Sequence, residues 1–110
     1  MELDSDRSCI SPADVERRRQ LRTFLIDCRS RVAPADIGLP LTDRRRVPGL
    51  RRGEVAEAAG VTTEWYRAFE RGRAVGVSPR FVSRIAKTFQ LTSAQEMKLF
   101  RLAFAELYRL

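Results

Sequence analysis

Histidine is absent from the chain, and cysteine occurs only as Cys9 and Cys28. A zinc site would need carboxylates to complete an unusual ligand set, and the commonest general base of enzymes is missing. We therefore expect no metal and no other cofactor. Cys28 lies on an apolar helical stretch and is expected in the core, while Cys9 lies in a polar N-terminal stretch, so no disulfide between them is expected.

Long apolar runs are also lacking, since no stretch approaches the ~20 residues that a membrane-spanning helix requires. Residues 1–11 have neither the basic start nor the apolar centre of a signal peptide. These absences predict a cytoplasmic location and no membrane partner. An enzyme is not expected either, because the chain has no glycine-rich phosphate loop and no nucleophile motif.

The alternation of apolar and polar residues that is typical of half-buried strands is missing too, which favours an all-α fold. At 110 residues, the chain has the length of one domain. Residues 1–10 are polar and without periodicity, so they are predicted to be a disordered lead-in. The folded domain is expected to span residues 11–110.

Positive charge is what the chain has in excess, with 21 Lys and Arg against 14 Asp and Glu and a net charge of +7. This excess indicates a polyanionic partner, with nucleic acid first and an acidic membrane surface second. All the cations except Lys87 and Lys98 are arginines, which grip phosphate and guanine edges with two parallel hydrogen bonds. Codon usage in a GC-rich genome would produce the same bias, so arginine content alone does not decide the partner.

The first helix is predicted to begin after Ser11, because Ser-Pro-Ala-Asp supplies a capping hydroxyl, a proline at the first helical position and an acid at the third. The triplet 17–19, all arginine, is expected mainly on its solvated side. Residues 32–49 then carry too many prolines and glycines for a regular element, and predict a long loop. The residues expected to face the core are Val15, Leu21, Phe24, Leu25 and Cys28 of the helix and Ile37, Leu39 and Leu41 of the loop.

Four more helices are predicted, over 51–59, from Thr62 to Gly72, from Ser78 to about Gln90, and from Thr92 to Leu110. The last one carries a broad apolar surface, which either closes the core or serves in part as an interface. The predicted inward residues are Val55, Ala56, Ala59, Tyr66, Phe69, Phe81, Val82, Ile85, Ala86 and Phe89, and the apolar residues of the last helix are Met97, Leu99, Phe100, Leu102, Phe104, Leu107 and Tyr108.

The most informative unit is LRRGEVAEAAGVTTEWYRAFERG, residues 50–72, which has a short helix, a tight turn and a second helix at the spacing of a helix-turn-helix. Two small residues let the helices cross nearly in contact, and a glycine allows the turn between them. Apolar residues then fix the angle, so that the second helix can enter a major groove about 12 Å wide. The residues with these structural roles are Ala56, Ala59, Gly60, Val61, Tyr66 and Phe69.

This unit resembles the Cro and phage-repressor type of helix-turn-helix regulators, and within it the branch related to the methylenomycin regulator (MmyB-like). The resemblance spans residues 21–103, and its most specific part is DIGLPLTDRRRVPGLRRGEVAEAAGV in the loop and the following helix. GVTTEWYRAFERGR and VSPRFVSRIAKTFQLTSAQEMKLFRLA are similar to the recognition helix and the closing helices. The resemblance implies a five-helix repressor-like DNA-binding domain with a long loop between its first two helices.

The resemblance also implies which residues touch DNA. Thr63, Glu64 and Arg67 would read bases, with Ala68 at the far edge of the exposed face. Thr62 would lie beside the backbone, although capping the helix is its simpler role. The positions that would contact the sugar-phosphate backbone are Arg51 and Arg52, Arg71 and Arg73 beyond the recognition helix, and the loop run Arg44, Arg45 and Arg46, which alternatively enters a minor groove or holds the loop by ion pairs.

Two further positions are assigned to the fold. In relatives, the position of Glu70 pairs with an arginine of the first helix, which is Arg29 here. Trp65 and Tyr66 are a candidate stacking platform for single strands, but packing in the core is the favoured interpretation. The chain departs from the family at Ala68, where an arginine is usual, so the base preference of relatives cannot be transferred.

The sequence is compatible with two functions. The favoured one is a transcriptional regulator that binds double-stranded DNA in a sequence-specific manner, as a homodimer on inverted half-sites. The other is a protein-interaction module, antitoxin-like or sigma-factor-binding, that uses the apolar surface of the last helix. MmyB-like proteins usually continue into a ligand-binding domain, so an effector domain or a partner protein is a further expectation.

Overall fold

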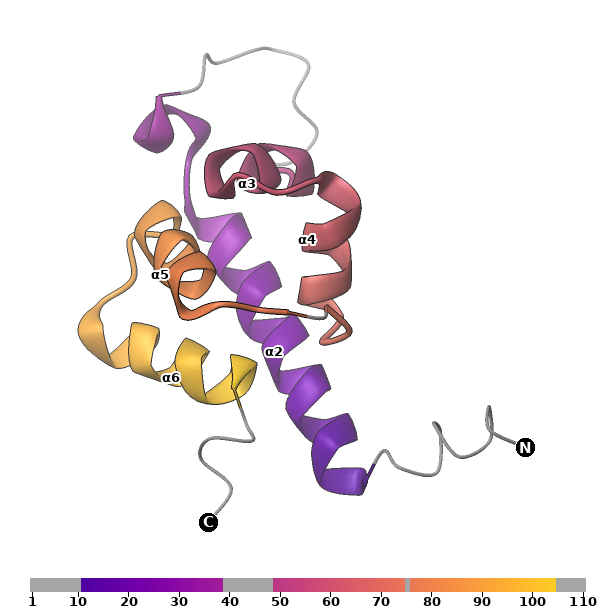
Figure 1. Ribbon diagram of the computed structural model, residues 1–110. Coiled ribbons are helices and arrows are strands. Elements are labelled where there is room, and N and C mark those ends of the chain that lie inside the picture. The colour runs from indigo at the N-terminus through magenta and orange to yellow at the C-terminus, as the bar shows by residue number, and fades with distance from the viewer. Residues whose placement is uncertain (1–10, 39–48, 75, 105–110) are drawn as a thin grey trace.

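The computed structural model describes residues 11–38, 49–74 and 76–104, and Figure 1 shows their arrangement. Within these ranges the fold is all-α, with five α-helices, one 3-10 helix and no strand. The long helix α2 crosses the molecule, with α4 against one side of it and α6 against the other. The helices are α2 (Pro12–Arg31), η1 (Pro34–Ile37, the 3-10 helix), α3 (Arg52–Ala59), α4 (Thr63–Glu70), α5 (Pro79–Thr88) and α6 (Ser93–Ala103).

Four of the helices begin at the hydroxyl caps that the sequence predicts. In each one a Ser or Thr oxygen accepts a hydrogen bond from the backbone N–H three residues later, which satisfies a group that has no partner within the helix. The Thr92 cap is reciprocal, because the Gln95 side chain accepts from the Thr92 N–H. The capping residues are Ser11, Thr62, Ser78 and Thr92.

One core joins α2 to the other helices, and every inward residue predicted for α3, α4 and α5 is buried. Cys28 is buried as expected, while Phe24 and Ile37 are partly buried against the core. Val15 was expected to face the core, but it is 55% exposed. It lies in the first turn of α2, which runs beyond the other helices of the described part (Figure 1), so no other described helix covers an apolar residue there.

The arginine triplet of α2 is only partly solvated, contrary to prediction. Arg17 is half-buried and donates from Nη1 to the Leu102 carbonyl oxygen at 2.7 Å, near the end of α6. Arg18 is half-buried against Gly72. Arg19 is exposed and paired with Glu16. Long aliphatic stems let such cations cover neighbouring helices, which a count of charged residues does not reveal.

The last helix is shorter than predicted. It ends at Ala103, and the backbone of Phe104 has left the helical region, with φ −124° and ψ 55°. Leu99 and Leu102 are buried in the core, so the described part of this apolar surface serves largely to close the domain. Met97 belongs to the same predicted surface but is 58% exposed. Leu107 and Tyr108 lie outside the described residues.

The long connection between α2 and α3 contains one regular element that was not predicted, the 3-10 helix η1. Residues 39–48 lie outside the described part, and with them Leu39 and Leu41. The chain returns against α2 at Gly49, where a Cβ would lie 2.2 Å from the Arg29 carbonyl oxygen. The Leu50 N–H donates to the same oxygen at 2.9 Å. Only glycine fits at this return point.

Candidate nucleic-acid interface

A tight turn fixes the two helices of the predicted helix-turn-helix. Gly60 has a φ of +79°, which favours glycine, and its N–H donates to the Glu57 carbonyl oxygen. The Val61 N–H donates to the Ala56 carbonyl oxygen at 3.0 Å. Ala56 and Ala59 are buried where α3 contacts α4 and α5. The turn therefore has the geometry that the sequence predicts.

The outer flank of α4 consists of Thr63, Glu64, Arg67 and Ala68. Glu64 and Arg67 are exposed, and neither side chain forms a hydrogen bond or an ion pair with any residue of the described ranges. Thr63 and Ala68 are half-buried. Thr63 lies beside α3, since a Cβ on Gly53 would come within 3.6 Å of its Oγ1. The structure therefore leaves two of the four predicted base-reading side chains exposed.

The inner flank of α4 is built around one carboxylate, Glu70, which is 1% exposed. It accepts two hydrogen bonds from Arg29, at 2.7 Å from Nε and 3.1 Å from Nη2. The Nε of Arg52 donates at 2.9 Å, and the Tyr66 hydroxyl donates at 2.9 Å. One carboxylate thus joins α2, α3 and α4, and the predicted pairing with Arg29 is confirmed.

The charge of this carboxylate is maintained by its partners. Burial alone would raise the pKa of Glu70, but the hydrogen bonds from Arg29 and Arg52 outweigh it, so the pKa lies below its ordinary value. Burial, with the carboxylate beside the hydroxyl, raises the pKa of Tyr66 well above its usual range. Tyr66 therefore remains a neutral donor, and α4 is held by a charged centre with no free acceptor oxygen.

Aromatic rings complete the inner side of α4. Trp65 lies parallel to Phe69, with ring centroids 6.0 Å apart, and meets Phe81 of α5 edge-on at 4.7 Å. Phe69 and Phe81 meet edge-on at 4.9 Å. Tyr66 is fully buried. Both aromatic residues that could have formed a stacking platform thus pack against the core, as the favoured interpretation has it.

Thr62 is the N-cap of α4, and its Oγ1 accepts from the Trp65 N–H at 3.0 Å. The side chain itself is exposed, at the entrance to the outer flank. The hydroxyl therefore has a defined structural role, and it also lies where a phosphate could approach the helix N-terminus.

The predicted backbone-contacting arginines differ in how much of each side chain is free. Arg51, Arg71 and Arg73 are exposed, and no side-chain partner is seen for them among the described residues. Arg52 gives its Nε to Glu70, and its side chain is 36% exposed. Arg44, Arg45 and Arg46 lie outside the described residues.

Two structural contacts of this region could not be foreseen from the sequence. One is the Arg52–Glu70 ion pair, whose partners are 18 positions apart and follow no spacing rule. The other is Arg84 of α5, whose Nη1 donates to the Ala59 carbonyl oxygen at 3.4 Å, at the C-terminus of α3. Basic side chains often satisfy the last carbonyls of a helix, but nothing local pairs Arg84 with this one.

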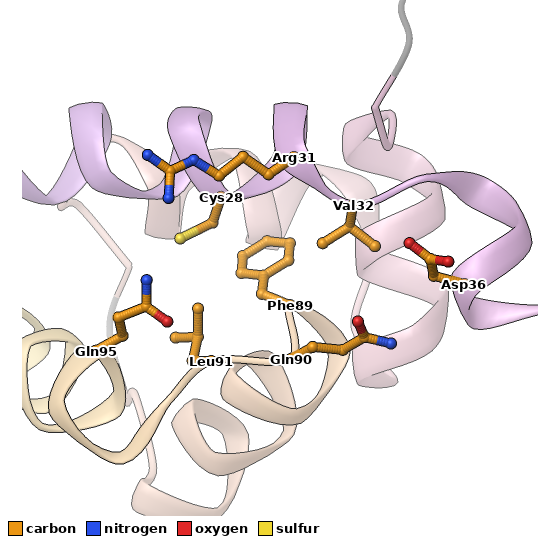
Figure 2. Close-up of a pocket in the computed structure, with 8 residues that line it drawn as sticks. All are labelled: Cys28, Arg31, Val32, Asp36, Phe89, Gln90, Leu91 and Gln95. Atoms are coloured by element: carbon orange, nitrogen blue, oxygen red, sulfur yellow. The ribbon is translucent and has the colours of Figure 1, made fainter.

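A hollow of about 230 Å³ lies elsewhere, between the C-terminal part of α2, η1 and the α5–α6 turn (Figure 2). The Cys28 side chain points into it from α2, and burial raises the pKa of its thiol to about 11. Two of its polar side chains already have partners, since Asp36 accepts from the Ala33 N–H and Gln95 from the Thr92 N–H. Over the described ranges, His, Cys, Asp and Glu form no group able to hold a metal ion.

A short helix, a glycine turn and a second helix with an open outer flank define the helix-turn-helix class of protein. A family model described as a helix-turn-helix domain matches residues 17–100, which is most of the chain. The chain belongs to this helix-turn-helix domain family. No curated protein and no solved structure shows a significant match to it. No helix of the described part is long and apolar enough to cross a membrane.

Proposed function

We propose that this protein is a transcriptional regulator that binds double-stranded DNA in a sequence-specific manner, with the outer flank of α4 in the major groove. The observation that supports it most strongly is the contrast within α4. Its inner flank is fixed by Glu70 and the aromatic core, while Glu64 and Arg67 on its outer flank are exposed, with no partner among the described residues. A rigid helix that presents free polar groups is what base recognition requires.

The side chains of the outer flank match the edges of different bases. Arg67 can donate two hydrogen bonds to guanine O6 and N7, and Glu64 can accept from cytosine N4. Thr63 offers its methyl group to thymine, while Ala68 bounds the contact surface and adds an apolar methyl. Because Thr63 and Ala68 are half-buried, Arg67 and Glu64 are assigned the larger share of the discrimination.

The surrounding cations would position the protein on the sugar-phosphate backbone. Arg51, Arg71 and Arg73 are exposed at the two ends of the helix-turn-helix and are open to phosphates. Arg52 retains N–H groups beyond the Nε that binds Glu70, and Thr62 lies at the start of α4. The same role is proposed for Arg44, Arg45 and Arg46 of the α2–α3 connection.

Three finer features complete the proposal. The sequence resemblance supports membership of the MmyB-like branch, in which an effector domain or partner protein carries the signal. Helix-turn-helix dimers bind two half-sites about one helical turn apart, so a homodimer on inverted half-sites is the expected arrangement. The excess of basic residues supports DNA as the partner in the cell, in the cytoplasm with the nucleoid.

The experiment is a selection of bound sequences from a random pool of DNA duplexes with the purified protein, followed by titration of the enriched duplex at several salt concentrations. We expect a palindromic consensus and an affinity that falls steeply as salt rises. Arg67→Ala should remove about 1–3 kcal/mol of preference at one base pair of each half-site while leaving the others.

A matched control is Arg101→Ala, which removes the same charge from an exposed position on α6. It should leave the base preference unchanged. An affinity that does not respond to salt, or a consensus that Arg67→Ala leaves intact, would contradict the recognition role of α4. Enrichment of a sequence without symmetry would contradict the dimer but not the recognition helix.

A further inference from the structure

The helix α2 is much longer than the helix-turn-helix needs. Its 20 residues extend over about 30 Å, whereas α3 and α4 have 8 residues each. Figure 1 shows its N-terminal half running past the C-terminal end of α4. The contact with α4 that holds the fold, between Arg29 and Glu70, uses the other end of α2. Leu21 of this N-terminal half is buried in the core and Arg17 binds α6, but its remaining surface is not explained by the core.

This surface lies beside the end of the recognition helix. Gly72, just after α4, is so close to α2 that a Cβ there would lie 2.6 Å from Cγ of Arg18. Residues four apart lie next to each other on one face of a helix, so Arg22 follows Arg18 on the face that meets α4 and its C-terminal extension. Arg71 and Arg73 flank the glycine at which this contact occurs.

The arginines of α2 differ in their partners, and Arg17 donates to the Leu102 carbonyl oxygen of α6. Arg19 is paired with Glu16, Arg31 with Asp27, and Arg29 with Glu70, so these three are neutralised by carboxylates. No ion pair of Arg18 or Arg22 is found among the described residues, and the carboxylate placed one turn from Arg18 on the same helix is that of Asp14. Arg22 is exposed, while Arg18 is half-buried and its Nε is a buried atom with no hydrogen-bond partner in the same ranges, so Arg22 is the more accessible of the two cations. The positive charge of α2 that remains unpaired on its α4 side is thus adjacent to Arg71 and Arg73.

We infer that Arg18 and Arg22 of α2, together with Arg71 and Arg73, form a second phosphate-binding surface that follows the DNA backbone beyond the base pairs read by α4. This inference rests on the proposed function and extends it. A protruding helix end with two unpaired arginines continues the basic surface past the recognition helix, and phosphates recur along the duplex about every 3.4 Å on each strand. Contacts of this kind add affinity without base preference.

The test is a salt titration of Arg22→Ala on a duplex of about 24 base pairs that contains the selected consensus at its centre. We expect a several-fold weaker affinity and a slope of log affinity against log salt that is smaller by about 1, as the loss of one phosphate contact gives. Base preference should be unchanged. Interference by ethylated phosphates should disappear at one backbone position in each half-site.

The control is again Arg101→Ala, which lowers the net charge equally from α6. Equal losses of affinity and equal slopes for the two variants would overturn the inference, because only the overall charge would then matter. Arg22→Lys should recover most of the affinity, and its failure to do so would also overturn a simple phosphate contact. Because Arg22 is exposed, the thermal midpoint should not move, and a shift of several degrees would indicate a structural role instead.

The two proposals fail in different ways. If the wild-type protein binds the selected duplex with salt-sensitive affinity and Arg67→Ala changes its preference, the recognition helix is supported whatever Arg22 does. If the wild-type protein shows this binding but Arg22→Ala and Arg101→Ala lose affinity equally and have equal salt slopes, only the phosphate-binding role of the α2 surface is rejected. A wild-type protein without salt-sensitive binding rejects both.

Discussion

A glutamate and an arginine lie at each flank of α4, the inner arginine being Arg29 of α2, and their surroundings on the two flanks are opposite. Glu70 on the inner flank is buried and accepts hydrogen bonds from two arginines and a tyrosine, whereas Glu64 on the outer flank is exposed. Arg29 is bound to a carboxylate, while Arg67 has no partner in the described ranges. The burial and the partners of a glutamate or arginine, and not its residue type, therefore decide whether it fixes the helix or is left free to bind a ligand. The inner flank sets the position of the helix, and the outer flank is left free to bind.

The largest effect is expected when the centre of the inner flank is removed. Glu70→Ala leaves Arg29 as a partly buried cation with only the Leu50 carbonyl oxygen as acceptor, and it leaves the buried Tyr66 hydroxyl without the acceptor it has in the wild type. A loss of about 3–5 kcal/mol in the free energy of unfolding is expected, as for other broken buried pairs. Urea-induced unfolding followed by far-UV circular dichroism measures it.

The outer flank supplies the matched control, because Glu64→Ala removes the same group from the same helix. Its effect should stay within about 0.5 kcal/mol. Similar losses of unfolding free energy in Glu70→Ala and Glu64→Ala would contradict the difference between a buried, bonded inner flank and an exposed outer flank.

A smaller effect on stability is expected from the N-cap of α4, Thr62. Thr62→Ala removes the hydroxyl that accepts from the Trp65 N–H, and should cost about 1 kcal/mol of stability. Thr62→Ser keeps the acceptor and should be close to the wild type in the same unfolding experiment. A stable Thr62→Ala variant with weakened DNA binding would instead assign this hydroxyl mainly to phosphate contact.

The smallest expected effect comes from the titration of Glu70, which changes the free energy of unfolding only at acidic pH. The pKa of Glu70 is lower in the folded protein than in the unfolded chain, where the pKa of a glutamate is about 4.3. The stability that this shift provides is fully present above the unfolded pKa and is lost as the pH falls through the folded pKa.

Glu70→Gln should therefore flatten the fall of stability with decreasing pH below about 4.3. The measurement is urea unfolding at several pH values between neutral and strongly acidic. A variant whose stability falls as steeply as that of the wild type would show that other carboxylates dominate acid unfolding.

Much of the fold could be predicted because its determinants are local. The caps at Ser11, Thr62, Ser78 and Thr92 each lie within three residues of the group they satisfy. Gly60 sets the turn by its own backbone conformation. The inward residues of α3, α4 and α5 followed from periodicity, since these helices are covered along their whole length.

The failures arise where the outcome depends on distant residues. Val15 has the right spacing for the core, but nothing in the described structure covers that end of α2. Arg17 and Arg18 look solvated by charge, yet α6 and Gly72 lie against them. The end of α6 at Ala103 was missed, because the apolar pattern continues beyond it.

The candidate site also contains features that local sequence rules cannot predict. The Arg29–Glu70 pair was expected only from the resemblance to relatives, and no local rule would have added Arg52 or the Tyr66 hydroxyl to it. The roles of Thr63, Glu64, Arg67 and Ala68 in binding DNA remain predictions, because they depend on a partner that lies outside the fold.

The buried thiol of Cys28 can be used to measure local opening of the fold around it. A thiol with a pKa of about 11 is almost entirely protonated at neutral pH, and little of it reaches the surface. Alkylating reagents should therefore modify Cys28 only during excursions that separate α2 from the α5–α6 turn. In a Cys9→Ser background, the rate of alkylation would report how often this interior is exposed, with no engineered cysteine.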